Sequence, residues 1–351
     1  MLVNDIKSVH IELTDKCQAQ CPMCARNHHG GKTRSFIRNG DISLTQFKEW
    51  FPKDFLAQLD NFYSCGNYGD PAFASDCLEI YAYVRECNPS VRLALHTNGG
   101  MRNVRWWREL AQFDIEVVFA VDGFKGKHEL YRKNTNFDKV IENMKAFISA
   151  GGKVRVDSLV FKHNETDVNE LEEYLLGLGV KEVKFISTTR FYEMNQFEVH
   201  DNDGNIEYYL EPTTLDRFKV TPNRELEKLV DAEYRKNAIE NSVIDPRCKN
   251  GENEIYVDPY GNIFPCCWTG SEYLEDPIEE KMPIHLLRNL SIQNTKEMFA
   301  QLGVPNCHTG VLRSNQELFS NIEKYWNGEN KCMICTRQCS KLMYNSKSKY
   351  E

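Results

Sequence analysis

The feature that most constrains this chain is a regular alternation of short apolar runs with helix-like stretches between residues 9 and 187. The apolar runs have the length of strands, and the stretches between them have the periodicity of amphipathic helices. Strands joined in succession through helices form a parallel sheet with the helices on its outside. The expected strands are Val9–Leu13, Asn61–Cys65, Arg92–His96, Glu116–Val121, Val154–Val160 and Glu182–Ile186.

Helices are expected between these strands, and their ends carry recognisable signals. Ser43 is a suitable cap for the first helix, while Gly151 and Gly179 follow the last two, where glycine commonly ends a helix. Spacing alone does not distinguish an open doubly wound sheet from a full or partial barrel. The expected helices are Leu44–Leu59, Asp76–Glu86, Val104–Ala111, Phe137–Ala150 and Val168–Leu178.

The alternation fails after about residue 187, which marks the end of the first part of the chain. A polar stretch through residues 200–205 and a charged helical segment at 222–236 are interpreted as connecting structure. A second unit begins near Pro246, where two short strands flank a Pro/Gly turn at residues 258–261. We therefore expect three parts, at residues 1–215, 216–245 and 246–351.

Charge and hydropathy exclude several classes of protein. The chain has 43 Lys and Arg against 51 Asp and Glu, a net charge of -8, and no basic stripe on which a phosphate backbone would lie. The N-terminus has no apolar core of a signal peptide, and no apolar stretch is long enough to span a membrane. We expect a cytoplasmic protein with no nucleic-acid or membrane partner.

The thirteen cysteines indicate metal or cluster binding, because disulfide frameworks belong to oxidising compartments. Cys17, Cys21 and Cys24 are spaced C-x3-C-x2-C directly after the first expected strand. Thiolates hold iron–sulfur clusters, usually four to a cluster, so three would leave one iron open to a substrate or cofactor. The alternatives are a zinc site completed by His28 or His29, and buried structural cysteines.

The first expected strand and these three cysteines resemble the signature of radical S-adenosylmethionine (radical SAM) enzymes. The resemblance implies a [4Fe–4S] cluster whose open iron is chelated by S-adenosylmethionine (SAM). An electron from that cluster would cleave SAM to methionine and a 5′-deoxyadenosyl radical. The resemblance also implies a partial (β/α)6 TIM-like barrel over roughly residues 5–215.

Further residues match the family one at a time, and all lie near the carboxyl ends of expected strands, where such folds place ligands. Met23 stands where the family often has an aromatic residue near the adenine. Gly69 and Asp70 resemble part of a Gly-Gly-Glu-Pro turn that receives the SAM amino group. Arg132 corresponds to an arginine that pairs with the SAM carboxylate. No residue is assigned a catalytic role.

A second cysteine group lies in the C-terminal part and has the spacing of a four-thiolate site for zinc or an iron–sulfur cluster. Its C-x12-G-x4-C element, followed by C-x2-C, resembles the auxiliary-cluster domains called SPASM and twitch. Because the last run is shorter than in SPASM, the resemblance implies a small α+β twitch-like domain with one auxiliary [4Fe–4S] cluster. The expected ligands are Cys248, Cys266, Cys332 and Cys335, with Cys339 competing for the fourth place, while Cys267 and Cys307 are free thiols or part of a second cluster.

The function implied by both resemblances is a radical SAM oxidoreductase or modifying enzyme. It would abstract hydrogen from a small metabolite or a peptide side chain, and the auxiliary cluster would assist substrate oxidation. A flavodoxin- or ferredoxin-type protein would supply the electron. The alternative is a non-catalytic zinc or iron–sulfur scaffold protein. The sequence leaves the substrate, the reaction outcome and the oligomeric state open.

Overall fold

A computed structural model describes residues 1–191, 194–219, 228–229, 231–277, 283–328 and 330–340. The chain forms two compact units, which do not follow single cuts of the sequence. Unit 2 comprises residues 11–47 and 61–220, and unit 1 comprises residues 1–10, 48–60 and 221–351. The first ten residues group with the C-terminal part because the backbone N–H groups of Lys7 and Ser8 donate to the carbonyl of Asn253. The expected connector at 216–245 lies partly outside the described residues.

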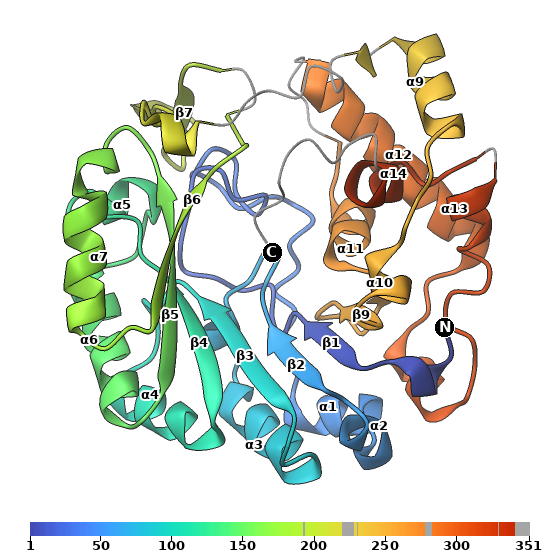
Figure 1. The fold of residues 1–351 in the computed structure, drawn as a ribbon, viewed down its shortest axis with the longest axis horizontal. Helices are drawn as coiled ribbons and strands as arrows, with labels where there is room; N and C mark the ends of the chain where they lie inside the picture. Colours follow the sequence, from blue (N-terminus) through green and yellow to red (C-terminus); the bar gives the residue numbers. More distant parts are fainter. Residues whose placement is uncertain (192–193, 220–227, 230, 278–282, 329, 341–351) are drawn as a thin grey trace. The chain divides into compact units, whose positions relative to one another are not determined.

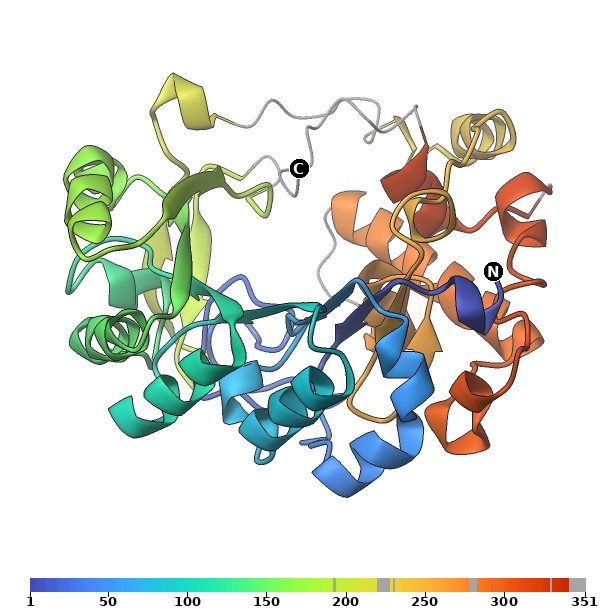
Figure 2. The same cartoon turned by 60° about the horizontal axis from the view of Figure 1, so that its bottom comes forward.

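Unit 2 contains a parallel sheet whose strands follow chain order, and its helices lie on the outer side of the strands (Figures 1 and 2). β2 to β6 pair in succession, all parallel. β6 ends the strand order of the described sheet, which does not close on itself. The expected partial (β/α)6 barrel is therefore confirmed. The strands are β2 (Asn61–Ser64), β3 (Arg92–Thr97), β4 (Ile115–Ala120), β5 (Lys153–Val160) and β6 (Glu182–Ser187); β1 (Ser8–Ile11) precedes them in the chain, and its residues 8–10 belong to unit 1.

The helices between these strands follow the expected pattern with one difference. The single helix expected over residues 44–59 is two helices, because Pro52 has extended backbone angles and no N–H to continue the first one. Asn103 and Asn136 cap α4 and α6 by accepting hydrogen bonds from backbone N–H groups of the first turn. The helices are α1 (Leu44–Trp50), α2 (Lys53–Ala57), α3 (Cys77–Cys87), α4 (Val104–Leu110), α5 (His128–Tyr131), α6 (Phe137–Ser149) and α7 (Val168–Gly177).

The core between the sheet and α4 and α6 holds the turn that follows β3. Trp107 is fully buried, with its ring centroid 5.1 Å from that of Phe119 and 6.3 Å from that of Phe147. Gly99 has a φ of +71°, and a Cβ atom there would lie 2.6 Å from the Phe119 ring. Only glycine fits this position. The turn that Gly99 forms places the neighbouring Asn98 at the carboxyl end of β3.

A hairpin that the sequence did not predict follows β6. β7 (Phe197–His200) and β8 (Ile206–Leu210) pair antiparallel after residue 187, where no strand was expected. The polar residues 201–205 form its turn, in which the Asp201 carboxylate accepts hydrogen bonds from two backbone N–H groups. The strands themselves are stabilised by packing, since Val199 and Leu210 are buried in unit 2.

Unit 1 contains the second hairpin, as expected. β9 (Glu254–Val257) lies beside β1, and β10 (Ile263–Phe264) pairs antiparallel with β9. The Asp258 carboxylate accepts from two backbone N–H groups of the turn between them, and Gly261 ends the turn with a φ of +81°. Of the charged helix expected at 222–236, residues 222–227 and 230 lie outside the described residues, and α9 begins within the expected span at Ala232. The helices are α9 (Ala232–Glu240), α10 (Arg247–Asn250), α11 (Cys267–Leu274), α12 (Pro283–Leu302), α13 (Lys324–Asn327) and α14 (Met333–Cys339).

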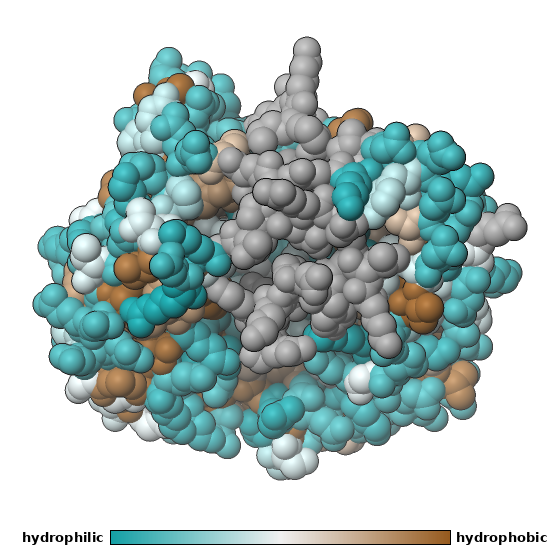
Figure 3. Space-filling view, turned by 45° about the horizontal axis from the view of Figure 1, so that its top comes forward, coloured by the Kyte–Doolittle hydropathy of each residue, from teal (hydrophilic) through white to brown (hydrophobic). Residues whose placement is uncertain are grey.

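The described surface visible in Figure 3 is largely hydrophilic, and hydrophobic residues appear there as separate patches. Within the part of the chain that the structure describes, no helix has both the length and the apolar character that crossing a membrane requires.

Candidate functional site

Cys17, Cys21 and Cys24 stand on one loop that follows β1. The loop is held by backbone hydrogen bonds, among them Gln20 N–H to the Lys133 carbonyl at 2.8 Å and Cys24 N–H to the Cys21 carbonyl at 3.1 Å. All three cysteines have free thiols, which are therefore available as ligands. The buried side chains of this loop pack in one cluster with others of unit 2, which consists of Ala19, Cys21, Met23, Tyr131, Phe161, Phe191, Val199 and Leu210.

Two side-chain donors from other elements point at the sulfur atoms. Asn98 Nδ2 lies 3.6 Å from Cys17 Sγ, and Arg132 Nη1 lies 4.0 Å from Cys21 Sγ. Gln18 Nε2 donates to Asn98 Oδ1 at 2.7 Å, which orients the amide so that its NH₂ group faces the sulfur. Hydrogen bonds to the sulfurs are one of the factors that tune an iron–sulfur cluster. These donors suit thiolates bound to iron.

Burial disfavours an isolated thiolate in this loop. It raises the pKa of Cys17 well above its ordinary value, and the nearby Asp70 adds to the effect. Burial raises the pKa of Cys21 to about 11, although Arg132 acts in the opposite direction. A bound metal ion reverses this preference, because a coordinated thiol is deprotonated. The loop therefore fits a cationic metal centre.

Arg132 is held in place by a buried carboxylate. Its Nε lies 2.5 Å from Asp122 Oδ2, and the Asp122 side chain is fully buried. The other oxygen of Asp122 accepts from the backbone N–H of Leu159 at 2.6 Å. Burial lowers the pKa of Arg132, but Asp122 and Cys21 raise it and prevail, so the guanidinium stays charged. One side of the guanidinium is anchored, and its Nη1 points toward the thiol loop.

The Asp70 carboxylate is held by hydrogen bonds from neighbouring residues. Its carboxylate accepts from the Thr97 hydroxyl at 2.9 and 3.0 Å, from Asn98 N–H at 2.7 Å and from Ala72 N–H at 2.9 Å. Burial raises the pKa of Asp70, and these hydrogen bonds oppose the rise. In this structure Asp70 therefore positions Asn98, and its expected role toward the SAM amino group stays a prediction.

Glu12 is a site residue that the sequence analysis missed. Its side chain is buried, and Oε1 accepts from the backbone N–H groups of Tyr68 at 2.7 Å and Gly69 at 2.8 Å. A Cβ atom on Gly69 would lie 1.8 Å from the Thr14 carbonyl oxygen, so glycine is required there. Glu12 thus fixes the turn after β2 beside the thiol loop. An acidic residue inside the apolar run before Cys17 was the signal.

Met23 lies in the loop cluster, as its position between two cysteines requires. Its side chain is buried, and its carbonyl oxygen accepts from Arg190 Nη1 at 2.9 Å. The structure thus places Met23 beside Cys21 and Cys24, while its contact with an adenine stays a prediction.

Five cysteines of unit 1 lie close enough to influence one another's ionisation. Burial raises the pKa of Cys248, and Cys266 and Cys339 add to it. A hydrogen bond with Cys332, together with burial, raises the pKa of Cys335, and Cys266 and Cys248 contribute in the same direction. Thiols that disfavour each other's charge share a buried space, and a metal centre there would compensate the negative charge of their thiolates. The group joins α10, the start of α11 and α14.

The two remaining cysteines of unit 1 differ from this group. The pKa of Cys307 is raised by burial and then by Asp258, without a contribution from another thiol. Cys267 is half-buried at the start of α11, next to Cys266. Neighbouring thiols therefore influence the pKa values of Cys248, Cys266 and Cys339, whereas Asp258 influences that of Cys307.

Residues 11–176 match the model of the radical SAM superfamily. The matched span begins in β1, includes the thiol loop, Asp70 and Arg132, and ends in α7. This chain contains a radical SAM domain. The resemblance expected from the cysteine spacing is confirmed, and its relatives support the SPASM/twitch subgroup.

Proteins with sequences similar to that of this chain have diverse names. The tungsten-containing aldehyde ferredoxin oxidoreductase cofactor-modifying protein of Pyrococcus furiosus is 22% identical over 273 residues, 74% of this chain and 71% of that protein. The GTP 3′,8-cyclase of Aquifex aeolicus is 25% identical, covering 76% and 84%. The antilisterial bacteriocin subtilosin biosynthesis protein AlbA of Bacillus subtilis is 23% identical, covering 75% and 55%. The solved structure of anSMEcpe with bound AdoMet is 18% identical, covers 74% of each chain and has a TM-score of 0.47.

Arg132→Lys in the radical SAM domain is expected to weaken SAM binding about tenfold. Lysine keeps the positive charge beside Asp122 but loses the fork that binds a carboxylate twice, a loss of about 1.5 kcal/mol. The dissociation constant is measured anaerobically by equilibrium dialysis. Lys125→Gln, which removes an exposed partner of Asp138, is the control and should bind SAM normally. Unchanged affinity of the Arg132 variant would remove this residue from the SAM site.

His128 makes the stability of the radical SAM domain depend on pH. Its Nδ1 accepts from Asp122 N–H at 3.2 Å, and burial lowers its pKa to about 4. The unfolded chain takes up this proton near pH 6.5, so the stabilisation is complete above that pH and declines as the pH falls toward 4. Between pH 7 and 5.5 the parent should lose about 1 kcal/mol more unfolding free energy than His128→Gln. Urea denaturation at both pH values measures this, and equal losses would contradict it.

Proposed function

We propose that this protein is an enzyme that reductively cleaves SAM and uses the product to abstract hydrogen from a bound substrate. The observation that supports this most is the thiol loop itself, where Asn98 and Arg132 direct N–H groups at two of three clustered sulfurs. A [4Fe–4S] cluster bound there supplies the electron that splits SAM. The chain's own residues hold that cluster through Cys17, Cys21 and Cys24 and orient SAM beside it.

Arg132 is the proposed partner of the SAM carboxylate. The buried Asp122 fixes one side of its guanidinium, so little side-chain freedom is lost when the carboxylate binds. Gly69 and Asp70 are proposed to line the site of the SAM amino group, with the turn held by Glu12, and Met23 is proposed to lie near the adenine. We assign no catalytic acid or base.

Unit 1 is proposed to hold one auxiliary [4Fe–4S] cluster on Cys248, Cys266, Cys332 and Cys335, with Cys339 as the competing fourth ligand. The rise in the pKa of Cys248 that Cys266 and Cys339 add to, and the rise in the pKa of Cys335 that Cys332, Cys266 and Cys248 add to, support a shared centre. Such a cluster supplies a site that accepts an electron as the substrate is oxidised. The free thiols fit a reducing compartment, and we propose a cytoplasmic location and a flavodoxin- or ferredoxin-type reductant.

The substrate is proposed to be a small metabolite or a peptide side chain. Relatives with similar coverage of this chain include a GTP 3′,8-cyclase and a protein of bacteriocin biosynthesis, so both substrate classes occur among them. Neither name decides between a nucleotide-like metabolite and a peptide for this chain.

Anaerobic reconstitution with iron and sulfide tests the proposed function. We expect a brown protein with about eight irons per chain, which forms 5′-deoxyadenosine from SAM when dithionite is added. A colourless protein that takes up stoichiometric zinc and leaves SAM intact would instead support the alternative, a non-catalytic scaffold with structural thiol sites.

A further inference from the structure

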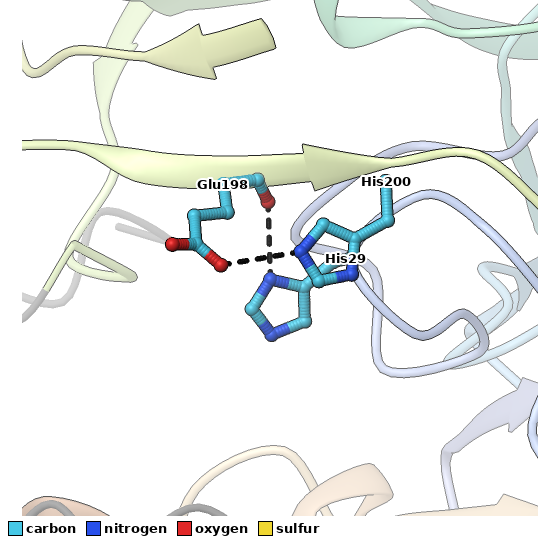
Figure 4. A group of neighbouring side chains, drawn as sticks. All are labelled: His29, Glu198 and His200. Carbon is cyan, nitrogen blue, oxygen red and sulfur yellow. Dashed lines mark hydrogen bonds and ion pairs between the residues drawn. The ribbon is translucent and has the colours of Figure 1, made fainter. Parts of the chain in front are cut away.

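We propose that His29, Glu198 and His200 form a binding site for a divalent transition-metal ion, with zinc as the expected occupant (Figure 4). One ring nitrogen of each histidine and one carboxylate oxygen lie within 4.8 Å of one another. Two imidazoles and one carboxylate are a donor set of zinc sites that keep an open position, whereas magnesium and calcium prefer oxygen ligands. The site lies in unit 2 and uses none of the thiols.

A tight turn over residues 27–33 presents His29 to the β7–β8 hairpin. His29 itself has a φ of +50°, which turns the chain back on itself. A Cβ atom on Gly31 would lie 2.2 Å from the Asp201 carbonyl oxygen, so only glycine allows this approach. The backbone N–H of His200 donates to the His29 carbonyl at 2.9 Å. The backbone therefore brings the three side chains together before any metal binds.

His29 is prepared as a ligand by its hydrogen bond. Its Nδ1 lies 3.0 Å from the backbone carbonyl oxygen of Glu198. A carbonyl can only accept, so Nδ1 carries the hydrogen and Nε2 keeps a lone pair. Figure 4 shows Nε2 on the side of the ring away from the Glu198 carboxylate, so the His29 ring turns when Nε2 binds the metal. Histidines that bind metals commonly donate their other N–H in this way. The ring also stacks on Phe197 with centroids 4.6 Å apart.

Glu198 and His200 already have the spacing of two ligands on one metal. Glu198 Oε2 and His200 Nε2 are 3.2 Å apart. Bonds of about 2.0–2.1 Å in a tetrahedral site place neighbouring ligand atoms about 3.3 Å apart. The His200 ring stacks on His29, and a metal lies in the plane of each imidazole that binds it, so binding turns His200 out of the stack. Its half-buried side chain and the exposed Glu198 leave room for this movement.

A metal at this site would tie the segment that follows Cys24 to β7. Lys133 already connects the thiol loop itself to β7, since its Nζ donates to the His200 carbonyl at 2.7 Å and its own carbonyl accepts from Gln20 N–H. A coordinated metal would add a second link, between the segment that follows Cys24 and β7. We infer that the ion braces the thiol loop against the hairpin.

Metal counting on the cluster-loaded protein tests this site. Protein whose thiols are occupied by iron is dialysed against buffered zinc, and both metals are measured by mass spectrometry. We expect about one more zinc per chain in the parent than in the His29→Gln/His200→Gln double variant, with equal iron. X-ray absorption should show nitrogen and oxygen neighbours at about 2.0–2.1 Å from this zinc.

Glu207→Gln serves as the matched control. It neutralises a carboxylate on the neighbouring strand that pairs with Lys133, and it should keep the zinc. Equal zinc in the parent and the double variant would overturn the proposal, as would sulfur neighbours at about 2.3 Å. Iron content and circular dichroism of the double variant separate loss of the metal site from loss of the fold.

Discussion

Replacing Cys17, Cys21 and Cys24 together by alanine is expected to abolish SAM cleavage and to lower iron from about eight to about four atoms per chain. The cleavage should be lost completely because no other thiol group shares this loop in the described part of unit 2. Iron should fall only by half because the remaining thiol group belongs to unit 1. Iron assay and chromatography of 5′-deoxyadenosine after dithionite measure both effects.

A cysteine outside both groups provides the control for this triple variant. Cys87 is half-buried at the end of α3, so Cys87→Ala should retain full iron and normal SAM cleavage. Formation of 5′-deoxyadenosine by the triple variant would contradict the assignment of the thiol loop. Loss of all iron would mean that the two cysteine groups do not load independently.

Replacing Cys266 or Cys332 by alanine is expected to remove about four irons per chain and to destabilise unit 1. Cys332 is fully buried, and Cys266 stands beside the small β9–β10 hairpin. Loss of the cluster therefore leaves the remaining buried thiols without the metal that stabilises them, which should lower the stability of unit 1. Cleavage of SAM without substrate should survive, since it requires only the cluster on the thiol loop. Iron assay and thermal unfolding measure the two effects.

The same series decides between Cys335 and Cys339 as the fourth ligand. Whichever residue is the ligand should lose about four irons when changed to alanine, and the other should keep them. Cys307→Ala is the control, because burial and Asp258, not another thiol, raise its pKa. If Cys267→Ala or Cys307→Ala loses iron as Cys266→Ala does, a pair of auxiliary clusters explains the C-terminal part better.

The parallel sheet could be predicted because its information is local. Each strand of the parallel sheet coincides with a short, largely apolar run, and the ends of α6 and α7 are marked by Gly151 and Gly179, both with positive φ. The ends of the observed strands differ from the expected ones by two residues at most. Local propensity and burial agree in these segments, so the pattern alone sufficed.

The β7–β8 hairpin could not be predicted because its stability is not local. Its strands are short and carry charged residues, and the buried Val199 and Leu210 belong to a cluster with residues far away in the chain, those of the thiol loop among them. The long helix expected at 44–59 failed for a different reason. There the apolar period continues through Pro52, and the backbone constraint of proline outweighs the pattern.

The sequence by itself determined that three thiols share one loop after the first strand, because a spacing of two or three residues brings side chains together in almost any conformation. Only the tertiary structure decided which distant groups face them. Asn98 reaches Cys17, Glu12 holds Gly69, and His29 meets His200 only after the chain has folded. Contacts between residues far apart in the chain depend on packing and loop closure, which leave no fixed spacing in the sequence.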